Sequence, residues 1–134
     1  MFLLDTNIVS ELVKRAPDSK VITRLNQESP AGLFISTITI FELRYGAARS
    51  AKPASLWAGI QRNIMARFQI LPFTEQDALA AADLMAPSVA AGQNPALQDI
   101  FLAGAAFSRG FTFVTRNQRD FDRVVGLQIE NWFI

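Results

Sequence analysis

Short apolar segments that alternate with helical patterns place the strongest limit on how this chain can fold. The first segment is Met1–Leu4, and similar segments lie at 33–35, 69–71 and 111–115. Each has the length of a short strand that is covered on both faces. Alternating strands and helices form a parallel sheet with right-handed crossovers. We therefore expect an α/β fold with a short, mostly parallel central sheet of four to five strands, including an edge strand at 126–129.

The segments between these strands show the residue spacing of amphipathic helices. This spacing and the capping residues predict helices at 7–15, 18–28, 37–48, 54–68, 74–91 and 94–109. Asp18 and Thr74 are predicted N-caps, and Asn94 followed by Pro95 is predicted to begin the last helix. That helix is apolar on nearly all sides, so we expect it to lie between the sheet and another layer.

Length and composition exclude several classes of protein. With 134 residues, the chain is expected to form a single domain, 1–134. It contains no cysteine and no histidine, which excludes a disulfide framework, a thiolate nucleophile and Ser-His catalysis. Because no apolar run approaches the roughly 20 residues that cross a bilayer, we expect no membrane contact and a cytoplasmic location. The mean hydropathy of +0.18 indicates a well-filled interior or a surface that a partner covers.

Acidic and amide residues are placed after three of the predicted strands. Asp5 comes directly after the first, Glu42 lies in the helix after the second, and Asn117 and Asp120 follow the fourth. Asp99 lies within the nearly all-apolar helix, where an acid is costly unless it is paired or bound to a metal. Because the carboxyl ends of parallel strands share one edge of the sheet, we expect these side chains to lie close together.

Three of these acids also have simpler structural interpretations. Asp5 is a good N-cap for the helix that follows it, and Glu42 completes a capping-box pattern with Thr39. Asp99 can be interpreted simply as a favourable negative charge near a helix N-terminus. The recurrence of acids at equivalent places favours a shared site, whereas Asp83, which lies among alanines, is expected to be solvated surface.

Carboxylates that converge without histidine or cysteine are typical of a site for a hard cation. Mg²⁺ is favoured, with Mn²⁺ as the alternative, because only oxygen ligands are offered. Such an ion can activate water and neutralise a phosphoryl transition state, so the predicted reaction class is phosphodiester hydrolysis. The Gly-rich nucleotide loops and the GxSxG elbow of competing α/β enzymes are missing from the sequence.

The net charge of +1 includes acids that a metal ion would neutralise, and the rest of the chain is more basic than this value. The chain has 13 basic and 12 acidic residues, so if four acids surround a metal ion the rest of the surface carries 13 − 8 = +5. Ten of the thirteen bases are arginine, whose planar guanidinium binds phosphate through two parallel hydrogen bonds. A polyanionic substrate is therefore compatible with the composition.

Four segments together resemble the motifs of PIN-domain nucleases, in the order and spacing of the VapC and FitB toxins of bacterial type II toxin–antitoxin systems. The segments are Leu4-Asp5-Thr6-Asn7, Glu42-Leu43-Arg44-Tyr45-Gly46, Asp99-Ile100-Phe101-Leu102-Ala103 and Thr115-Arg116-Asn117-Gln118-Arg119-Asp120-Phe121. The resemblance spans essentially the whole chain, including the closing Gly126-Leu127 and Asn131-Trp132. It implies a PIN-like three-layer α/β/α fold.

The resemblance also implies an activity. It identifies the chain as a Mg²⁺-dependent endoribonuclease that hydrolyses RNA with metal-activated water and is held inactive by a cognate antitoxin. Asp5, Glu42 and Asp99 match the acids that bind metal in this family. Asn117 stands where relatives often have a fourth acid, and Asp120 is an alternative source of that carboxylate. The residues expected to contact the substrate or shape the site around these acids are Thr6, Asn7, Thr115, Arg116 and Asn117.

The partners implied are a cognate VapB/FitA-like antitoxin, the RNA substrate, a second copy of the chain in a homodimer, and promoter DNA reached only through the antitoxin. The predicted helices at 7–15 and 54–68 have wide apolar faces, which favour a homodimer with a groove for an antitoxin helix. Two alternatives stay open. One is a catalytically weak PIN module that acts mainly as an antitoxin-binding co-repressor, and the other is a PIN nuclease that cuts DNA.

Overall fold

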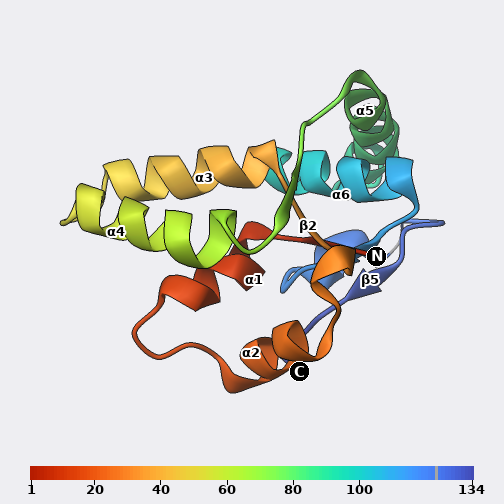
Figure 1. Cartoon of the computed structure of the whole chain (residues 1–134). Coiled ribbons are helices and arrows are strands. Elements are labelled where there is room, and N and C mark those ends of the chain that lie inside the picture. Colours follow the sequence, from red (N-terminus) through yellow and green to blue (C-terminus); the bar gives the residue numbers. More distant parts are fainter. Residues whose placement is uncertain (123) are drawn as a thin grey trace.

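The computed structural model of the chain describes residues 1–122 and 124–134 (Figure 1). It contains a five-stranded sheet in the order β3-β2-β1-β4-β5. The strands are β1 Phe2–Leu4, β2 Leu33–Ser36, β3 Gln69–Leu71, β4 Thr112–Val114 and β5 Ile129–Glu130. All four pairings are parallel. The expected α/β fold with a short parallel sheet is confirmed, although the last strand begins three residues later than predicted.

Helices connect these strands and cover the sheet. They are α1 Thr6–Val9, η1 Ser10–Val13, α2 Ser19–Gln27, η2 Pro30–Gly32, α3 Thr37–Ala48, α4 Pro53–Ile60, η3 Gln61–Met65, α5 Glu75–Ala90, α6 Leu97–Arg109 and η4 Gln118–Phe121. Asp18 and Thr74 cap α2 and α5 as predicted, each through its side-chain oxygen. Within the described residues, no helix is both long and apolar enough to cross a membrane.

Three predicted helices differ from the structure. The helix predicted at 7–15 is an α-helical turn followed by the 3₁₀ turn η1 and ends at Val13. The chain leaves the helical path here because Glu11 is buried and accepts a 2.8 Å hydrogen bond from the backbone N–H of Asp18. The helix predicted to begin at Asn94 begins at Leu97 instead, because Ala96 has an extended backbone and is its N-cap.

The helix predicted at 54–68 is also interrupted, since α4 continues as the π turn η3. Its buried residues Ile60, Ile64 and Phe68 are spaced four apart. An ideal α-helix rotates such residues by about 40° for each step of four. The wider π turn offsets this rotation between Ile60 and Ile64, and the helix ends at Met65, before Phe68.

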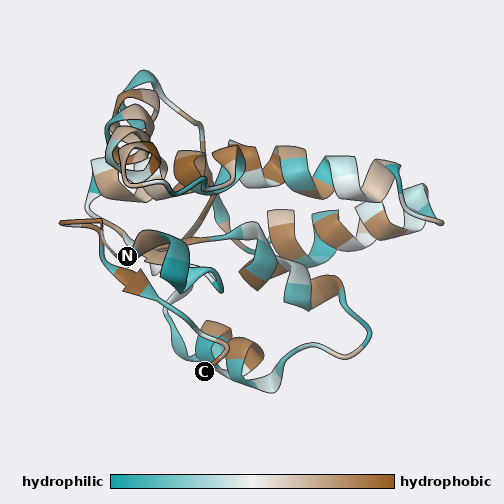
Figure 2. Ribbon diagram, turned by 180° about the vertical axis from the view of Figure 1, so that it is seen from behind, coloured by the Kyte–Doolittle hydropathy of each residue, from teal (hydrophilic) through white to brown (hydrophobic). Residues whose placement is uncertain are grey.

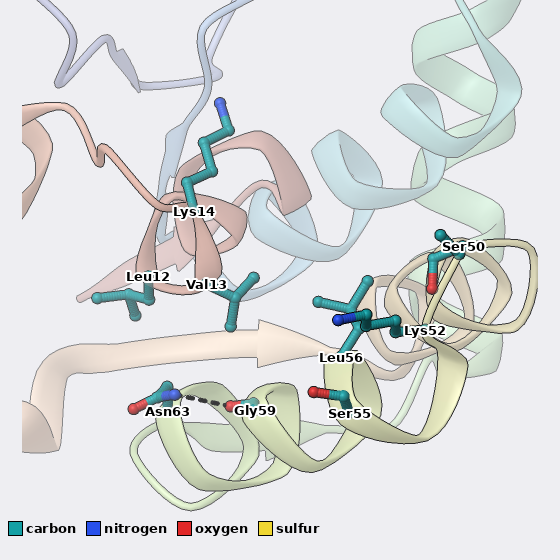
Figure 3. A pocket seen from close by; sticks show the side chains of 10 residues that line it. Leu12, Val13, Lys14, Ser50, Lys52, Ser55, Leu56, Gly59 and Asn63 are labelled. Atoms are coloured by element: carbon teal, nitrogen blue, oxygen red, sulfur yellow. Dashed lines mark hydrogen bonds between the residues drawn. The ribbon is translucent and has the colours of Figure 1, made fainter.

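Helices α3 and α4 form a hairpin along which hydrophobic and hydrophilic residues alternate (Figure 2). A groove of about 560 Å³ lies between η1 and this hairpin. Leu12, Val13 and Leu56 provide its apolar lining, while Lys14 and Lys52 also line it (Figure 3). We call this feature the hairpin groove.

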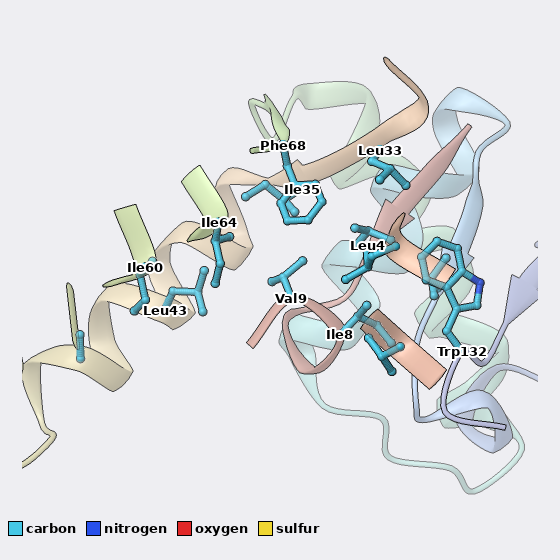
Figure 4. Packing of buried hydrophobic residues seen from close by; sticks show 14 residues of the cluster. Leu4, Ile8, Val9, Leu33, Ile35, Leu43, Ile60, Ile64, Phe68 and Trp132 are labelled. Atoms are coloured by element: carbon cyan, nitrogen blue, oxygen red, sulfur yellow. The ribbon is translucent and has the colours of Figure 1, made fainter. Parts of the chain in front are cut away.

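Successive strand residues pack on opposite faces of the sheet. Leu4 and Ile35 belong to a core cluster with residues of α1 to α4 and with Trp132 (Figure 4). Leu3 and Phe113 belong to a second cluster with residues of α5 and α6. The sheet therefore lies between two helical layers, and the three-layer expectation is confirmed.

The packing of α6 against α5 depends on Gly104. A Cβ atom at this position would lie 2.6 Å from the backbone nitrogen of Ala81. We expect Gly104→Ala to lower the free energy of unfolding by about 1–3 kcal/mol, because overpacking forces the helices apart. Gly46→Ala is the matched control, since a Cβ there meets nothing within 4 Å, and it should raise stability by up to about 1 kcal/mol through helix propensity. Urea unfolding measures both, and equal effects would contradict the close helix contact.

Candidate functional site

Asp5 lies at the point where the strand order reverses. The chain runs outward from β1 to β2 and β3 on one side, whereas β4 and β5 lie on the other. In open α/β sheets this arrangement leaves a crevice at the carboxyl ends of the two central strands, where ligands bind. Asp5 follows β1 and Thr115 follows β4, and the Thr115 hydroxyl donates a 2.7 Å hydrogen bond to Oδ2 of Asp5.

The Asp5 carboxylate is buried, and both of its oxygens accept hydrogen bonds. Oδ1 accepts from the backbone N–H of Thr6 at 2.7 Å, so Asp5 is the N-cap of α1. The pKa of Asp5 is raised from 3.8 to about 7, mainly by burial and also by the charges of Asp99 and Glu42, while the hydrogen bonds from Thr115 and Thr6 act to lower it. Asp5 is therefore both a cap and a buried acid coupled to two others.

Glu42 lies in α3 and faces α1. The Thr6 hydroxyl donates a 2.7 Å hydrogen bond to Oε1 of Glu42, and the hydroxyl oxygens of Thr6 and Thr39 lie 3.1 Å apart. Ser36 is the N-cap of α3, so the capping-box interpretation of Thr39 and Glu42 is wrong. Burial raises the pKa of Glu42, the bond from Thr6 lowers it, and the charge of Asp99 raises it.

Asp99 lies in the first turn of α6 rather than deep within a helix, because α6 begins later than predicted. Its carboxylate is partly buried, and Nδ2 of Asn117 donates a 3.3 Å hydrogen bond to Oδ2. Burial raises the pKa of Asp99, the bond from Asn117 lowers it, and the charge of Asp120 raises it. Asp99 is therefore both a favourable charge near the N-terminus of α6 and an acid coupled to other acids.

Asn117 and Asp120, the two candidates for the fourth position, differ in their contacts. Asn117 contacts Asp99, and its backbone N–H donates to the Thr115 hydroxyl at 3.0 Å. Asp120 is exposed in η4 and acts on Asp99 through its charge; in the described chain it has no hydrogen bond to the three acids. Asp83 is exposed in α5, as predicted.

The three acids fit the chemistry of a hydrated divalent cation. Asp5 is coupled to Asp99 and Glu42, and Glu42 is coupled to Asp99. Among residues 1–122 and 124–134, no basic side chain forms a salt bridge with any of them, and no three acids lie close enough together to chelate an ion directly. Mg²⁺ commonly keeps several waters and is held through one or two carboxylates. The arrangement suits that mode rather than a closed cage of acids.

The C-terminal tail contributes residues to which the sequence assigned no role in the site. Because β5 is parallel to β4, the residues after β5 lie on the same edge of the sheet as Asp5. Asn131 lines a polar cleft of about 330 Å³ together with residues of 116–120. The guanidinium carbon of Arg116 lies 4.5 Å from the centre of the Phe133 ring. The available sequence signal is a polar residue just after an edge strand, the same kind of signal that pointed to Asp5.

The sequence and the fold of this chain are similar to those of known proteins. The PIN domain family matches residues 2–127. Ribonuclease VapC2 of Haemophilus influenzae is 35% identical over 131 residues, covering 98% of this chain and 97% of the relative. The tRNA(fMet)-specific endonuclease VapC of Salmonella typhimurium is 34% identical with the same coverage. The crystal structure of DNA-bound VapBC from Salmonella typhimurium matches with a TM-score of 0.87 and 34% identity, covering 98% of this chain and 97% of that chain.

Proposed function

Since this chain belongs to the PIN-domain family, we propose that it is a Mg²⁺-dependent endoribonuclease toxin of a VapBC-like type II toxin–antitoxin system. Its relatives are named ribonuclease and tRNA(fMet)-specific endonuclease, which supports a nuclease acting on phosphodiester bonds. The observation that carries the proposal is the electrostatic coupling of Asp5, Glu42 and Asp99 at the switch point of the sheet.

Each acid is oriented by a partner of its own. The pairs are Thr115 with Asp5, Thr6 with Glu42 and Asn117 with Asp99. These acids would hold Mg²⁺, which when bound supplies an activated water and stabilises charge on the phosphoryl group. With a pKa of about 7, Asp5 keeps a proton in part of the metal-free molecules near neutral pH. That proton must leave Oδ2 or Oδ1 before a cation binds, so metal affinity should rise with pH.

The direct test is a divalent-metal titration of RNA cleavage combined with a binding measurement. Cleavage should appear with Mg²⁺ or Mn²⁺ and disappear with EDTA, and calorimetry should detect Mg²⁺ binding that Asp99→Asn weakens. Cleavage that persists in EDTA would reject metal dependence. Antitoxin binding without cleavage in any divalent metal would favour the co-repressor alternative.

RNA is the proposed substrate, and tRNA is the first class to test because one relative is named for tRNA(fMet). The same acids would act on the phosphodiester bonds of DNA, so the discrimination depends on contacts to the 2′-hydroxyl. Oligonucleotides of matched sequence in RNA and DNA form decide between them. Faster cleavage of the DNA strand would favour the DNA-cutting alternative.

The fourth position gives a graded prediction. Asp120→Asn is expected to lower the rate of cleavage about tenfold, because the charge of Asp120 acts on Asp99. Losses of this size are typical when a residue that supports a metal ligand is replaced. Asp122→Asn is the matched control, since it removes the same charge from an exposed residue in the same segment. Single-turnover rates measure both. Small and equal effects would mean that the site operates with three acids.

We propose that the cognate VapB/FitA-like antitoxin lays a helix in the hairpin groove and thereby connects the toxin to promoter DNA. The apolar lining of that groove, given by Leu12, Val13 and Leu56, suits the apolar face of a helix. The solved structure of DNA-bound VapBC supports, by analogy, an antitoxin partner and a connection to DNA. The proposal includes a homodimer, for which the exposed and stacked rings of Phe41 and Tyr45 on α3 offer an apolar surface.

Antitoxin inhibition is expected to weaken as Mg²⁺ increases. The reason is that a basic side chain from the antitoxin would pair with the site carboxylates and exclude the cation, so the two compete. The measurement is the antitoxin concentration for half-inhibition across a Mg²⁺ series, with the dimer state checked by light scattering. Inhibition that does not change with Mg²⁺ would reject displacement and favour blocking of the RNA groove.

A further inference from the structure

Among the residues that the structure describes, only polar and charged side chains line the cleft beside the acids. Its lining residues are Arg116, Asn117, Gln118, Arg119, Asp120 and Asn131. Asn117 belongs both to this cleft and to the hydrogen bond with Asp99. The cleft is therefore continuous with the proposed catalytic site, and we call it the tail cleft because Asn131 closes it from the C-terminal tail.

Arg116 is a positively charged residue that lines the tail cleft. It lies at an edge of the sheet that is rich in acids, yet no carboxylate in the described part of the chain lies within salt-bridge distance of it. Its guanidinium carbon lies over the Phe133 ring instead, 4.5 Å from the ring centre. A guanidinium can interact with a ring through its face while its N–H groups, which point outward in its plane, bind a phosphate.

Phe133 is held in place by the tail around it. Its backbone N–H donates a 2.9 Å hydrogen bond to Oδ1 of Asn131. The preceding Trp132 is 3% exposed and packs edge-on against Phe2, with ring centres 5.2 Å apart. Trp132 also donates through Nε1 to Glu130 at 3.1 Å. The backbone on which the Phe133 ring lies is thus anchored to the fold through Asn131 and Trp132.

We propose that Arg116 binds a backbone phosphate of the RNA strand adjoining the one that is cleaved, and that Phe133 is the positioning residue that keeps the guanidinium in place. The inference rests on the proposed nuclease function and extends it by assigning a substrate contact and its support. Arg116 was expected from the sequence to contact the substrate or shape the site, without a specific contact, and Phe133 had no assigned role. A phosphate contact of this kind fixes the register of the strand without reading its bases.

The test measures binding of a short, fluorescein-labelled single-stranded RNA in the Asp99→Asn background with Mg²⁺, so that the RNA stays intact. Arg116→Ala should weaken binding about tenfold and reduce by about one the slope of log affinity against log salt, as expected for one lost phosphate contact. In the wild-type background the same change should raise KM and leave kcat nearly unchanged. Arg44→Ala is the matched control, because that guanidinium stacks on Trp57 at 4.8 Å on the α3–α4 hairpin and should not alter binding.

A mutant cycle tests the role of Phe133. Phe133→Leu should weaken RNA binding about threefold, an effect on the scale of one exposed cation–π contact, and Phe133→Trp should restore it. In the Arg116→Ala background, Phe133→Leu should have no further effect, because the two residues act as one unit. Additive effects would overturn the positioning role, and urea unfolding of each variant separates binding loss from loss of the fold.

The outcomes distinguish this inference from the proposed function. If the parent protein neither binds the RNA nor cuts it before Asp99 is changed, both fail. If the parent binds RNA and Arg116→Ala binds equally well, or no worse than Arg44→Ala, only the phosphate contact fails.

Discussion

Replacing Asp5 or Asp99 by asparagine is expected to lower RNA cleavage by about a thousandfold, the upper scale of losing one electrostatic stabiliser in a hydrolytic site. Asparagine preserves the shape of the side chain and keeps one oxygen to accept the hydrogen bond from Thr6 at Asp5. It removes the negative charge that a hard cation needs. The loss should therefore be in metal-dependent chemistry and not in folding.

The matched control is Asp83→Asn, which removes the same charge from an exposed position on α5 and should leave the rate unchanged. Single-turnover cleavage across a Mg²⁺ series measures the effect, and circular dichroism checks the fold. The Asp99→Asn rate should recover in part at high Mg²⁺ if that acid contributes to metal affinity. Cleavage by Asp5→Asn at the wild-type rate would contradict the assigned site.

The metal-free protein is expected to lose stability as pH rises from about 4 to about 7. The pKa of Asp5 is raised by burial from 3.8 to about 7 in the folded chain, so between these values the folded state holds a proton that the unfolded state has released. Stability then falls with increasing pH. One pKa unit corresponds to 1.36 kcal/mol, so the contribution of Asp5 to the free energy of unfolding falls by up to about 4 kcal/mol.

Asp5→Asn isolates this effect because it removes the titrating group. The variant should be more stable than the wild type by up to about 4 kcal/mol at pH 7.5, and the two should converge near pH 4. Added Mg²⁺ should stabilise the wild type at pH 7.5 and leave the variant almost unchanged, since binding to the folded state alone raises stability. Parallel pH curves for the two proteins would contradict a raised pKa at Asp5.

Other acids also shape the total curve, and Asp99 and Glu42 affect the difference between these two proteins through their coupling to Asp5. Glu42 and Asp99 also have raised pKa values, mainly through burial, and add to the loss at higher pH. Asp77 acts in the opposite direction. Burial raises the pKa of Asp77, but hydrogen bonds from Ser108, Thr74 and Arg109 lower it below its ordinary value overall. The stability that Asp77 contributes is therefore lost as the pH falls from its ordinary pKa to the lower pKa of the folded chain. Urea unfolding at a series of pH values measures the difference directly.

Local patterns in the chain determined most of the elements that position the site. The apolar run before Asp5, with the capping residues Asp18 and Thr74, predicted strand and helix boundaries correctly, because burial on a sheet and the capping of free N–H groups act over a few residues. Acids after successive strands also indicated a common edge, since parallel strands carry their carboxyl ends to the same side. This reasoning requires only the alternation of strands and helices.

Only the tertiary structure decided which side chains meet and how strongly they interact. The Thr115 hydroxyl reaches Asp5 across 110 positions of sequence, and the tail brings Phe133 beneath Arg116, because β1 and β5 flank β4 in the sheet. The breaks after Val9 and Ile60 likewise accompany buried contacts that no local pattern contains. Strand order and burial depend on the packing of the whole chain, and they determine the pKa of Asp5 and the partners of the acids.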